Sequence, residues 1–340
     1  MTRAGHTNVR PKFFDDIMQR LTEFISKQIL PIGLLTVAIV GLVFPQPGRY
    51  LATLPTQYVA VSVIFFLSGL MLRTEEMFAA LSAWRGTLWG TVSILFVTPA
   101  IGTAIAFQIP IDPAFQLGLA LFCCMPTTLS SGLALTTQAR GNSALALLLT
   151  LVTNMAGIFT VPFVLALLLG ALGQVELSAS DLLVKLCVSI LLPLTAGKIV
   201  RGFVATWAGG NRKKLTTASN LALITIPWMK FSESSEELAQ VALDHLLLLI
   251  VSGLSIHILY LVLNAGVCSL LRLPEPARRA VVLMASQKTL PVAMTVLAFL
   301  PDSAVSTQTK GLLAIPCITF HLGQIALDAV IATRWGNRES

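Results

Sequence analysis

Charged residues are scarce in this chain, and their scarcity excludes most classes of soluble protein. Only 11% of its 340 residues are Asp, Glu, Lys or Arg, whereas 55% are hydrophobic and the mean hydropathy is +0.81. An average soluble domain carries about 25% charged residues. The composition therefore predicts a polytopic membrane protein of the all-α class, in contact with the lipid bilayer.

Signatures of enzymes, metal sites and nucleic-acid binding are also missing. The sequence contains no His-Glu-x-x-His motif, no Gly-Asp motif of intramembrane aspartate enzymes and no nucleophile elbow. The net charge of +7 comes from basic residues scattered through short loops, which argues against nucleic acid as a partner. The five cysteines lie in apolar runs without paired metal spacing, so we interpret them as packing residues. We expect no enzyme and no organic cofactor.

Ten apolar runs follow one another and are expected to span the membrane. They lie at residues 29–44, 56–72, 86–108, 114–138, 143–170, 181–200, 217–230, 244–271, 278–300 and 311–333. Because the first run begins only near Ile29, no cleavable signal peptide is visible. Residues 1–12 are predicted to be a disordered basic tail, residues 13–26 an amphipathic helix on the membrane surface, and residues 334–340 a second tail.

The basic residues predict the orientation, since Lys and Arg concentrate on the cytosolic side of membrane proteins. With these ten spans, 18 of the 23 Lys and Arg residues fall on the side shared by both termini. Only Arg49, Lys230 and Lys310 fall on the other side, and Lys185 and Lys288 remain inside spans. Both termini are therefore predicted to face the cytosol or its organellar equivalent.

Three short landmarks recur at nearly one spacing, which predicts an internal repeat. The pairs are Leu30-Pro31 with Leu192-Pro193 (192 − 30 = 162), Glu75-Glu76 with Glu236-Glu237 (236 − 75 = 161) and Thr128-Leu129 with Thr289-Leu290 (289 − 128 = 161). The copies would be residues 27–170 and 178–333. Five spans per copy require the second copy to be inverted, a pattern typical of secondary transporters with a site at the bilayer midplane.

The ninth span carries a lysine and a proline at its centre, in the stretch from Ser286 to Pro291. A charge at the centre of a span costs at least ~2.5–3.5 kcal/mol on insertion scales, so it normally faces a cavity or a partner. Pro291 removes a backbone donor, and Gln287 and Thr289 offer replacement hydrogen-bonding groups. We interpret the stretch as a broken helix around a binding site.

The fourth span is interrupted in a similar way, between Cys124 and Gly132. Pro126 removes a backbone donor, and four hydroxyl groups follow, from Thr127, Thr128, Ser130 and Ser131. If the two breaks meet, their half-helix amino ends favour an anion and their carboxyl ends favour a cation. The alternative is a pair of proline kinks repaired by hydroxyl groups, without a ligand.

Other polar residues inside spans have two interpretations each. Thr150 and Asn154 share one face of the fifth span, and they either line the site or hydrogen-bond between helices. In the tenth span, His321, Gln324 and Asp328 recur at helical spacing. They either belong to the site, with Asp328 beside a cation, or form a structural network. His257 is interpreted as a packing histidine.

These motifs resemble the bile acid:sodium symporter superfamily, most closely the branch of solute carrier family ten member seven and the plant plastid-type sodium/metabolite cotransporters. The resemblance rests on four stretches: Phe122 to Gly132, Gly141-Asn142, Ala285 to Pro291, and His321 with Gln324. It implies ten helices in two inverted repeats, a panel and a core domain, and crossing of broken helices four and nine. It also implies organic anions as substrates, usually moved with sodium.

The resemblance places sodium near the crossing. The matching ligands would be Ser130, Ser131, Thr150 and Gln287. The family's glutamate does not carry over, because Leu283 stands at its position, and Ala146 replaces a second hydroxyl of the fifth span. Lys288 adds a positive charge beside the site. It would either stand in for sodium permanently or exchange a proton.

The sequence thus predicts a secondary transporter of a small organic anion. The candidate site residues are Thr127, Thr128, Ser130, Ser131, Thr150, Asn154, Ser286, Gln287, Lys288, Thr289, His321 and Gln324. The alternative is a membrane regulator of calcium or ion homeostasis with little transport of its own, a role linked with relatives in this branch. The plastid envelope is the expected location in a plant or alga, and otherwise the plasma membrane.

Overall fold

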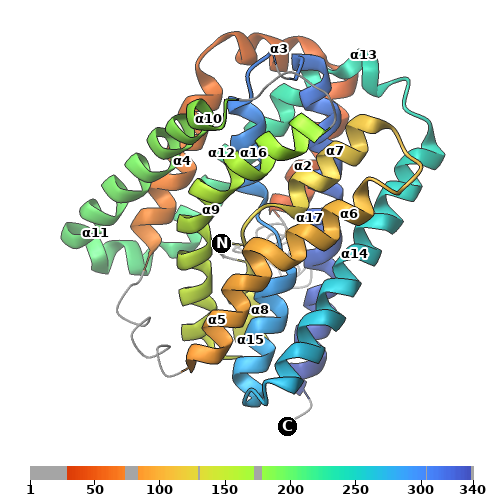
Figure 1. Ribbon diagram of the computed structural model, residues 1–340. Helices are drawn as coiled ribbons and strands as arrows, with labels where there is room; N and C mark the ends of the chain where they lie inside the picture. Colours follow the sequence, from red (N-terminus) through yellow and green to blue (C-terminus); the bar gives the residue numbers. More distant parts are fainter. Residues whose placement is uncertain (1–28, 73–82, 129–130, 172–177, 304, 338–340) are drawn as a thin grey trace, which may run out of the picture.

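The computed structural model describes residues 29–72, 83–128, 131–171, 178–303 and 305–337, and no strand occurs among them (Figure 1). By length and composition, six helical segments of this described part can cross a membrane, or seven if the bent pair α2 and α3 counts as one span. The prediction of an all-helical chain with several apolar spans is confirmed. The predicted tail at 1–12 and the surface helix at 13–26 lie outside the described residues.

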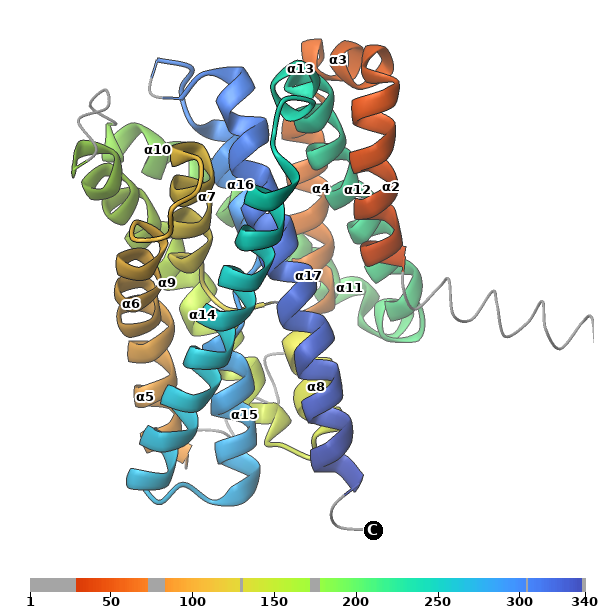
Figure 2. The ribbon, with the colours of Figure 1, turned by 90° about the vertical axis from the view of Figure 1, so that its right-hand side faces the viewer.

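One set of helices, here called the panel group, packs together on one side of the molecule (Figure 2). Its members are α2 (Ile29–Val43), α3 (Pro45–Thr53), α4 (Thr56–Met71), α11 (Leu192–Gly210) and α12 (Arg212–Glu233). α2 packs along α12, and α4 packs along α11. The sequence did not predict α3, which turns away from α2 by 98°.

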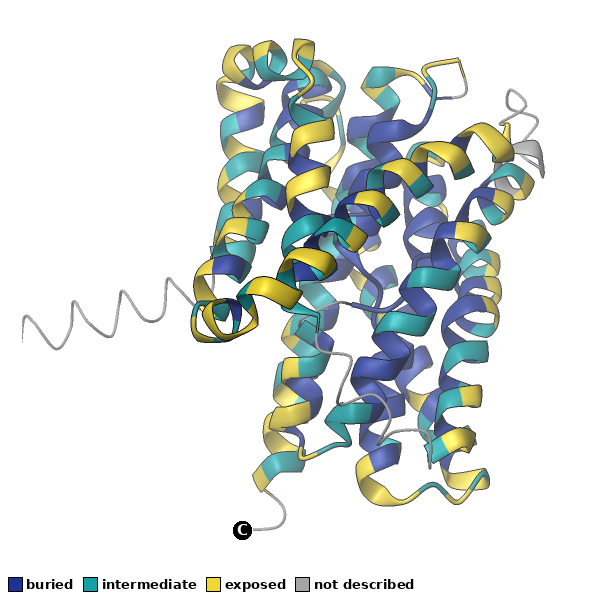
Figure 3. Cartoon of the chain, turned by 90° about the vertical axis from the view of Figure 1, so that its left-hand side faces the viewer, coloured by how far each residue is buried: buried dark blue, intermediate teal, exposed yellow. Residues whose placement is uncertain are grey.

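Most of the remaining helices form the core group, where buried residues concentrate along the sides that face one another (Figure 3). They are α5 (Trp84–Val92), η2 (Ser93–Val97), α6 (Thr98–Ala106), α7 (Pro113–Cys123), α8 (Ser131–Gln138), α9 (Ser143–Ala171), α14 (Leu243–Leu270), α15 (Glu275–Ser286), α16 (Leu290–Phe299) and α17 (Thr307–Asn337). α10 (Ala179–Leu186) and η3 (Cys187–Leu191) lead into α11, and α13 (Ser235–Leu238) is a short turn after α12. α17 runs past residue 333, where we expected the last span to end.

Proline positions explain the irregular turns inside these helices. Two π-helical segments, η2 and η3, are each followed by a proline in the next helix, Pro99 and Pro193. Proline has no backbone N–H, so the preceding turn widens and a carbonyl loses its helical donor. The fourth and ninth spans are interrupted where expected, since residues 124–128 and 287–289 are not helical.

Polar caps hold the ends of the core helices. Asn142 accepts a hydrogen bond from the N–H of Leu145 at the start of α9, and its own N–H donates to the carbonyl of Pro276. Arg279 donates to the carbonyl of Ala139, just beyond α8. These bonds tie the loop between α8 and α9 to α15, and they give the Gly141-Asn142 motif a structural role.

The three basic residues assigned to the side opposite the termini each have an acidic partner. The pairs are Arg49 with Glu236, Lys230 with Glu233 and Lys310 with Asp302, at 3.0, 2.7 and 2.6 Å. The hydrogen bond from the Lys310 ammonium lowers the pKa of the Asp302 carboxyl. The helices α3 and α13, which carry the first pair, lie at the end of the molecule opposite the carboxyl terminus (Figure 2).

Two glycines let the backbones of α4 and α11 touch. A Cβ atom at Gly69 would lie 2.0 Å from the carbonyl oxygen of Leu194, and one at Gly197 would lie 2.0 Å from that of Phe66. Small residues at such crossings are a common device for close packing of membrane helices. The contact therefore requires glycine at both positions.

We expect Gly197→Ala to lower the free energy of unfolding by about 1–3 kcal/mol, because the added methyl group must push α11 away from α4. The matched control is Gly202→Ala in the same helix, where nothing lies within 4 Å of the added Cβ. That change should be neutral or stabilising, since alanine favours a helix over glycine. Thermal unfolding of the purified protein in detergent measures both. Equal melting temperatures for the two variants would contradict the close packing.

Candidate functional site

The two interrupted helices meet at their breaks. The N–H of Thr289 donates to the carbonyl of Pro126 at 2.9 Å. The hydroxyl of Thr128 donates to the side-chain oxygen of Gln287 at 2.5 Å and accepts from the N–H of Gly132 at 3.0 Å. Backbone groups released by each break are thus bound by groups from the other. This contact region is called the crossing below.

α9 supports the crossing from one side. The amide of Asn154 donates to the carbonyl of Thr127 at 3.0 Å, and the hydroxyl of Thr150 lies 3.4 Å from the carbonyl of Thr128. Thr127 in turn donates its hydroxyl to the carbonyl of Met284 on α15. Thr150 and Asn154 therefore hydrogen-bond from α9 to the interrupted fourth span. This is one of the two roles that the sequence left open for them, the other being to line the site.

The same two residues also line a small cavity between the core and panel groups. Its volume is about 40 Å³, and Ser68 of α4 and Leu194 of α11 lie across from them. About 10–15 Å³ suffices for one water molecule. The side-chain oxygen of Asn154 is buried and has no hydrogen-bond partner in the described part of the chain. The cavity is thus large enough for a water molecule or a small ion.

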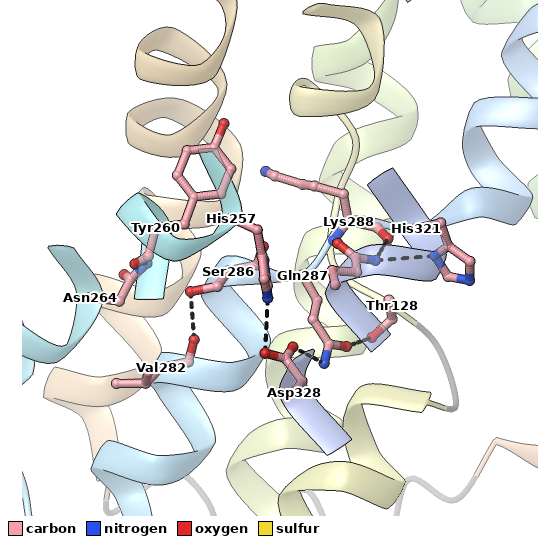
Figure 4. A network of polar contacts seen from close by, with 11 residues as sticks. Thr128, His257, Tyr260, Asn264, Val282, Ser286, Gln287, Lys288, His321 and Asp328 are labelled. Carbon is pink, nitrogen blue, oxygen red and sulfur yellow. Dashed lines mark hydrogen bonds and ion pairs between the residues drawn. The ribbon is translucent and has the colours of Figure 1, made fainter. Parts of the chain in front are cut away.

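Lys288 is completely buried, and its ammonium points away from the crossing toward α14 (Figure 4). It donates to the carbonyl of Ile94 at 3.0 Å and to the hydroxyl of Thr98 at 2.9 Å, and lies 5.9 Å from the centre of the Tyr260 ring. All these partners are neutral. The positive charge is held by dipoles and an aromatic ring.

The π-helical segment η2 explains why the carbonyl of Ile94 is available. The N–H of Thr98 donates to the carbonyl of Ser93, which is the five-residue register of a π-helix. In that register the donor for Ile94 would be residue 99, which is proline and has no N–H. The ammonium of Lys288 supplies the missing donor, so the π-helical segment and the lysine form one structural unit.

Gln324 of α17 holds the backbone of the break on its other side. Its side-chain oxygen accepts from the N–H of Lys288 at 3.0 Å, and its nitrogen donates to the carbonyl of the same residue at 2.6 Å. The ring of His321 lies 3.1 Å from the same nitrogen. His321 and Gln324 therefore replace the helical hydrogen bonds that Lys288 lacks.

A chain of buried polar side chains continues from Gln287 to α14 (Figure 4). The Gln287 amide donates to one carboxylate oxygen of Asp328 at 2.6 Å. The other oxygen lies 2.8 Å from Nε2 of His257, whose Nδ1 lies 3.1 Å from the carbonyl of Ser286. His257 is buried, as expected of a packing histidine, but it also pairs with the carboxylate that we had considered as a partner for a cation.

Eleven of the twelve candidate residues lie in or beside this crossing. Ser131 begins α8 next to it, and Ser130 lies outside the described residues. The hydroxyl of Ser286 bonds within its own helix to the carbonyl of Val282, and that of Thr289 is buried without a partner in the described part. The sequence did not identify Thr98 and Tyr260 as partners of the Lys288 ammonium. The available signal was Pro99 in the third span, which marks an irregular turn beside Thr98.

We expect Thr98→Val to lower the free energy of unfolding by about 1.5–3 kcal/mol, because it removes a hydrogen bond to a buried ammonium group. In a Lys288→Met background most of that loss should disappear, and this double-mutant cycle isolates the contact. Thr225→Val, at a half-buried threonine whose hydroxyl bonds within α12 to Leu221, is the control and should have little effect. Denaturation in detergent measures the four proteins of the cycle and the Thr225→Val control. The same loss with and without the lysine would contradict the assigned contact.

Interrupted helices that meet at a buried polar crossing inside a bundle of apolar helices define a multi-pass membrane protein of the transporter class. A family model agrees: residues 28–337 match the SBF-like CPA transporter family, and the chain belongs to that family. The resemblance to the bile acid:sodium symporter superfamily is thereby confirmed. The family consists of transporters, which supports the expectation that this chain is not an enzyme.

The similarity to curated relatives extends over nearly the whole chain. This chain is 37% identical to the chloroplastic probable sodium/metabolite cotransporter BASS4 of Arabidopsis thaliana, over 94% of its own length and 75% of that protein. The BASS4 protein of Oryza sativa subsp. indica is 36% identical, over 94% of this chain and 78% of that protein. Sodium/bile acid cotransporter 7 of Mus musculus is 27% identical, over 92% of this chain and 93% of that protein.

Proposed function

We propose that this protein is a secondary active transporter of a small organic anion, in which the core group moves against the panel group. The observation that carries the proposal is the buried crossing, beside which a cavity lies between the two groups. Asn154 and Thr150 both hold the crossing and line the cavity. A movement that widens the cavity would therefore open it directly onto the breaks.

Electrostatics favour an anion at this place. The amino ends of α8 and α16 lie at the crossing, and such ends carry partial positive charge. Lys288 adds a positive charge whose contacts among the described residues are a carbonyl, a hydroxyl group and an aromatic ring, none of them a carboxylate. The cavity of about 40 Å³ is too small for an organic anion, so binding requires the two groups to separate.

Two modes of coupling follow from the residues at the crossing. Sodium would bind hydroxyl and amide oxygens of Ser130, Ser131, Thr150 and Gln287, in line with the names of the relatives. Against this, the Gln287 oxygen already accepts from Thr128, and Leu283 packs in an apolar cluster where a glutamate would be needed. We favour Lys288 as a built-in cation that takes the place of sodium.

We also propose that the ten predicted spans form two inverted repeats, residues 27–170 and 178–333. Adding 161 to the bounds of α7, 113–123, gives 274–284, close to α15 at 275–286; the same addition to α9, 143–171, gives 304–332, close to α17 at 307–337. The packing of α2 on α12 then has its counterpart in that of α11 on α4. Both termini would face the cytosol or the stroma, and the plastid envelope is the proposed location in a plant or alga.

Uptake by the purified protein in proteoliposomes tests the function. We expect uptake of at least one labelled anion from pyruvate, 2-oxoglutarate and taurocholate. We also expect Asn154→Ala to reduce it strongly, because that change removes the hydrogen bond that holds the carbonyl of Thr127. Ser255→Ala, at an exposed residue of α14, is the control. A folded protein that moves none of these anions would contradict transport and favour the regulator of ion homeostasis.

The same vesicles separate the two coupling modes. If Lys288 replaces sodium, uptake should be equal with sodium and with choline outside, and Lys288→Met should abolish it. Ser255→Ala is again the control and should leave uptake unchanged. Uptake that needs sodium and survives Lys288→Met would contradict the built-in cation.

A further inference from the structure

A groove lies on the surface of the panel group, between α4 and the segment from η3 to α11. Its volume is about 640 Å³. Sites that bind small organic molecules usually measure about 300–1,000 Å³. No described candidate residue of the crossing lines this groove, so it is separate from the small cavity beside Thr150 and Asn154.

The glycine contact between α4 and α11 closes one end of the groove. The two backbones touch at Gly69 and Gly197, and the lining residues Leu67 and Ala196 stand directly before these positions. From this contact, α4 and the segment from α10 to α11 diverge toward the end of the molecule where α3 lies (Figure 1). The groove is therefore a wedge that narrows toward the glycines.

The walls of the wedge are apolar, and its length matches one leaflet of a membrane. Tyr58, Val63, Val188 and Leu192 line it and are exposed, so in a membrane protein they face lipid. From Tyr58 to Leu67 the groove follows nine residues of α4 (67 − 58 = 9). At the rise of an α-helix this is about 14 Å. One leaflet supplies about 15 Å of the hydrocarbon core.

The wide end of the wedge carries groups that suit a lipid head group. Tyr58 lies in the first turn of α4, and tyrosine is enriched at the level of the head groups. Lys185 is exposed on α10, three and four residues before the lining residues Val188 and Ser189, so it shares their face. A helical side chain leans toward the amino end of its helix, which directs this ammonium group toward the wide end. Asp181, one turn earlier on α10, forms no ion pair with Lys185.

The shape of the wedge favours an acyl chain over a helix as its occupant. An α-helix with its side chains is about 10–12 Å wide, so a helix of a partner or of a second copy cannot enter the narrow end. A single acyl chain is thin enough to reach Phe66 and Ala196 there. Lipid tails are as apolar as leucine, so the groove gains nothing from the hydrophobic effect alone. Close packing of the chain and the charge of Lys185 must supply the selectivity.

We propose that this groove binds one anionic glycerophospholipid from the leaflet nearer α3, with an acyl chain between α4 and η3 and the phosphate at Lys185. Ser62 and Ser189 line the groove as well, and their hydroxyl groups are donors for the ester oxygens of the lipid. The chain fills the space between two helices that touch only at the glycines, so the lipid supports the panel group. Binding of this lipid requires no transport, and the inference therefore goes beyond the proposed function.

Native mass spectrometry of the full-length protein in detergent tests the site. After addition of equal amounts of phosphatidylglycerol and phosphatidylcholine with the same acyl chains, one lipid should remain bound, with about five-fold preference for phosphatidylglycerol from a single lysine contact. Val63→Phe and Ala196→Phe fill the groove from its two walls, and both should lose the bound lipid. The controls are Val59→Phe and Ile199→Phe, at exposed residues of the same helices that do not line the groove, and both should keep it. Thermal unfolding identifies the folded variants, and either filled variant suffices.

Lys185→Met separates the head-group contact from the chain contact. This variant should still retain one lipid but should bind both kinds equally. In the wild type, phosphatidylglycerol with a photoreactive group at the end of its acyl chain should crosslink near Phe66 and Ala196, and not near the exposed Val251 of α14.

Four results would overturn the proposal. They are equal lipid retention by the filled variants and their controls, a preference for phosphatidylglycerol that survives Lys185→Met, crosslinks that are as frequent on α14 as in the groove, and a wild-type protein that retains detergent only.

Discussion

The crossing depends on one constraint, which is that backbone N–H and C=O groups inside a membrane must find partners within the protein. Each of the two breaks releases such groups, and each break binds those of the other. Thr289 donates to Pro126, Thr127 donates to Met284, and Gln324 binds both backbone groups of Lys288. Because two of these bonds reach the backbone of the other break, neither interrupted helix can change its conformation without breaking them. The crossing is therefore formed jointly by α7 with α8, by α15 with α16, and by α9 and α17.

The Lys288 side chain meets the same requirement, because its ammonium group is the partner of a backbone carbonyl. A π-helical segment and a proline leave the carbonyl of Ile94 without a helical donor, and the ammonium satisfies it. Since the partners are neutral, the field of the ammonium is not cancelled by a counter-ion. The ammonium therefore gives its surroundings a positive potential. That potential opposes cations and attracts anions.

The sequence was sufficient to predict the breaks, because Pro126 and Pro291 within apolar runs leave few other structures available. It also located most of the polar groups that repair them. The direction of Lys288 was not predictable, since its partner is a backbone carbonyl, a group that every residue carries. His257 and Asp328 are 71 residues apart on two apolar helices, and nothing in either helix marks the other as its neighbour. Pairing of this kind depends on how helices rotate against each other, which packing alone decides.

The glycine contact between α4 and α11 has a mechanical consequence. Where backbones touch, there is no layer of side chains to rearrange, so the two helices cannot slide past each other without separating. The panel group is stiff along this line, whereas the boundary with the core contains a cavity, which Leu194 and Met155 help to line. Deformation will concentrate at that softer boundary. The glycine contact thus determines which of the two groups is the stiffer one.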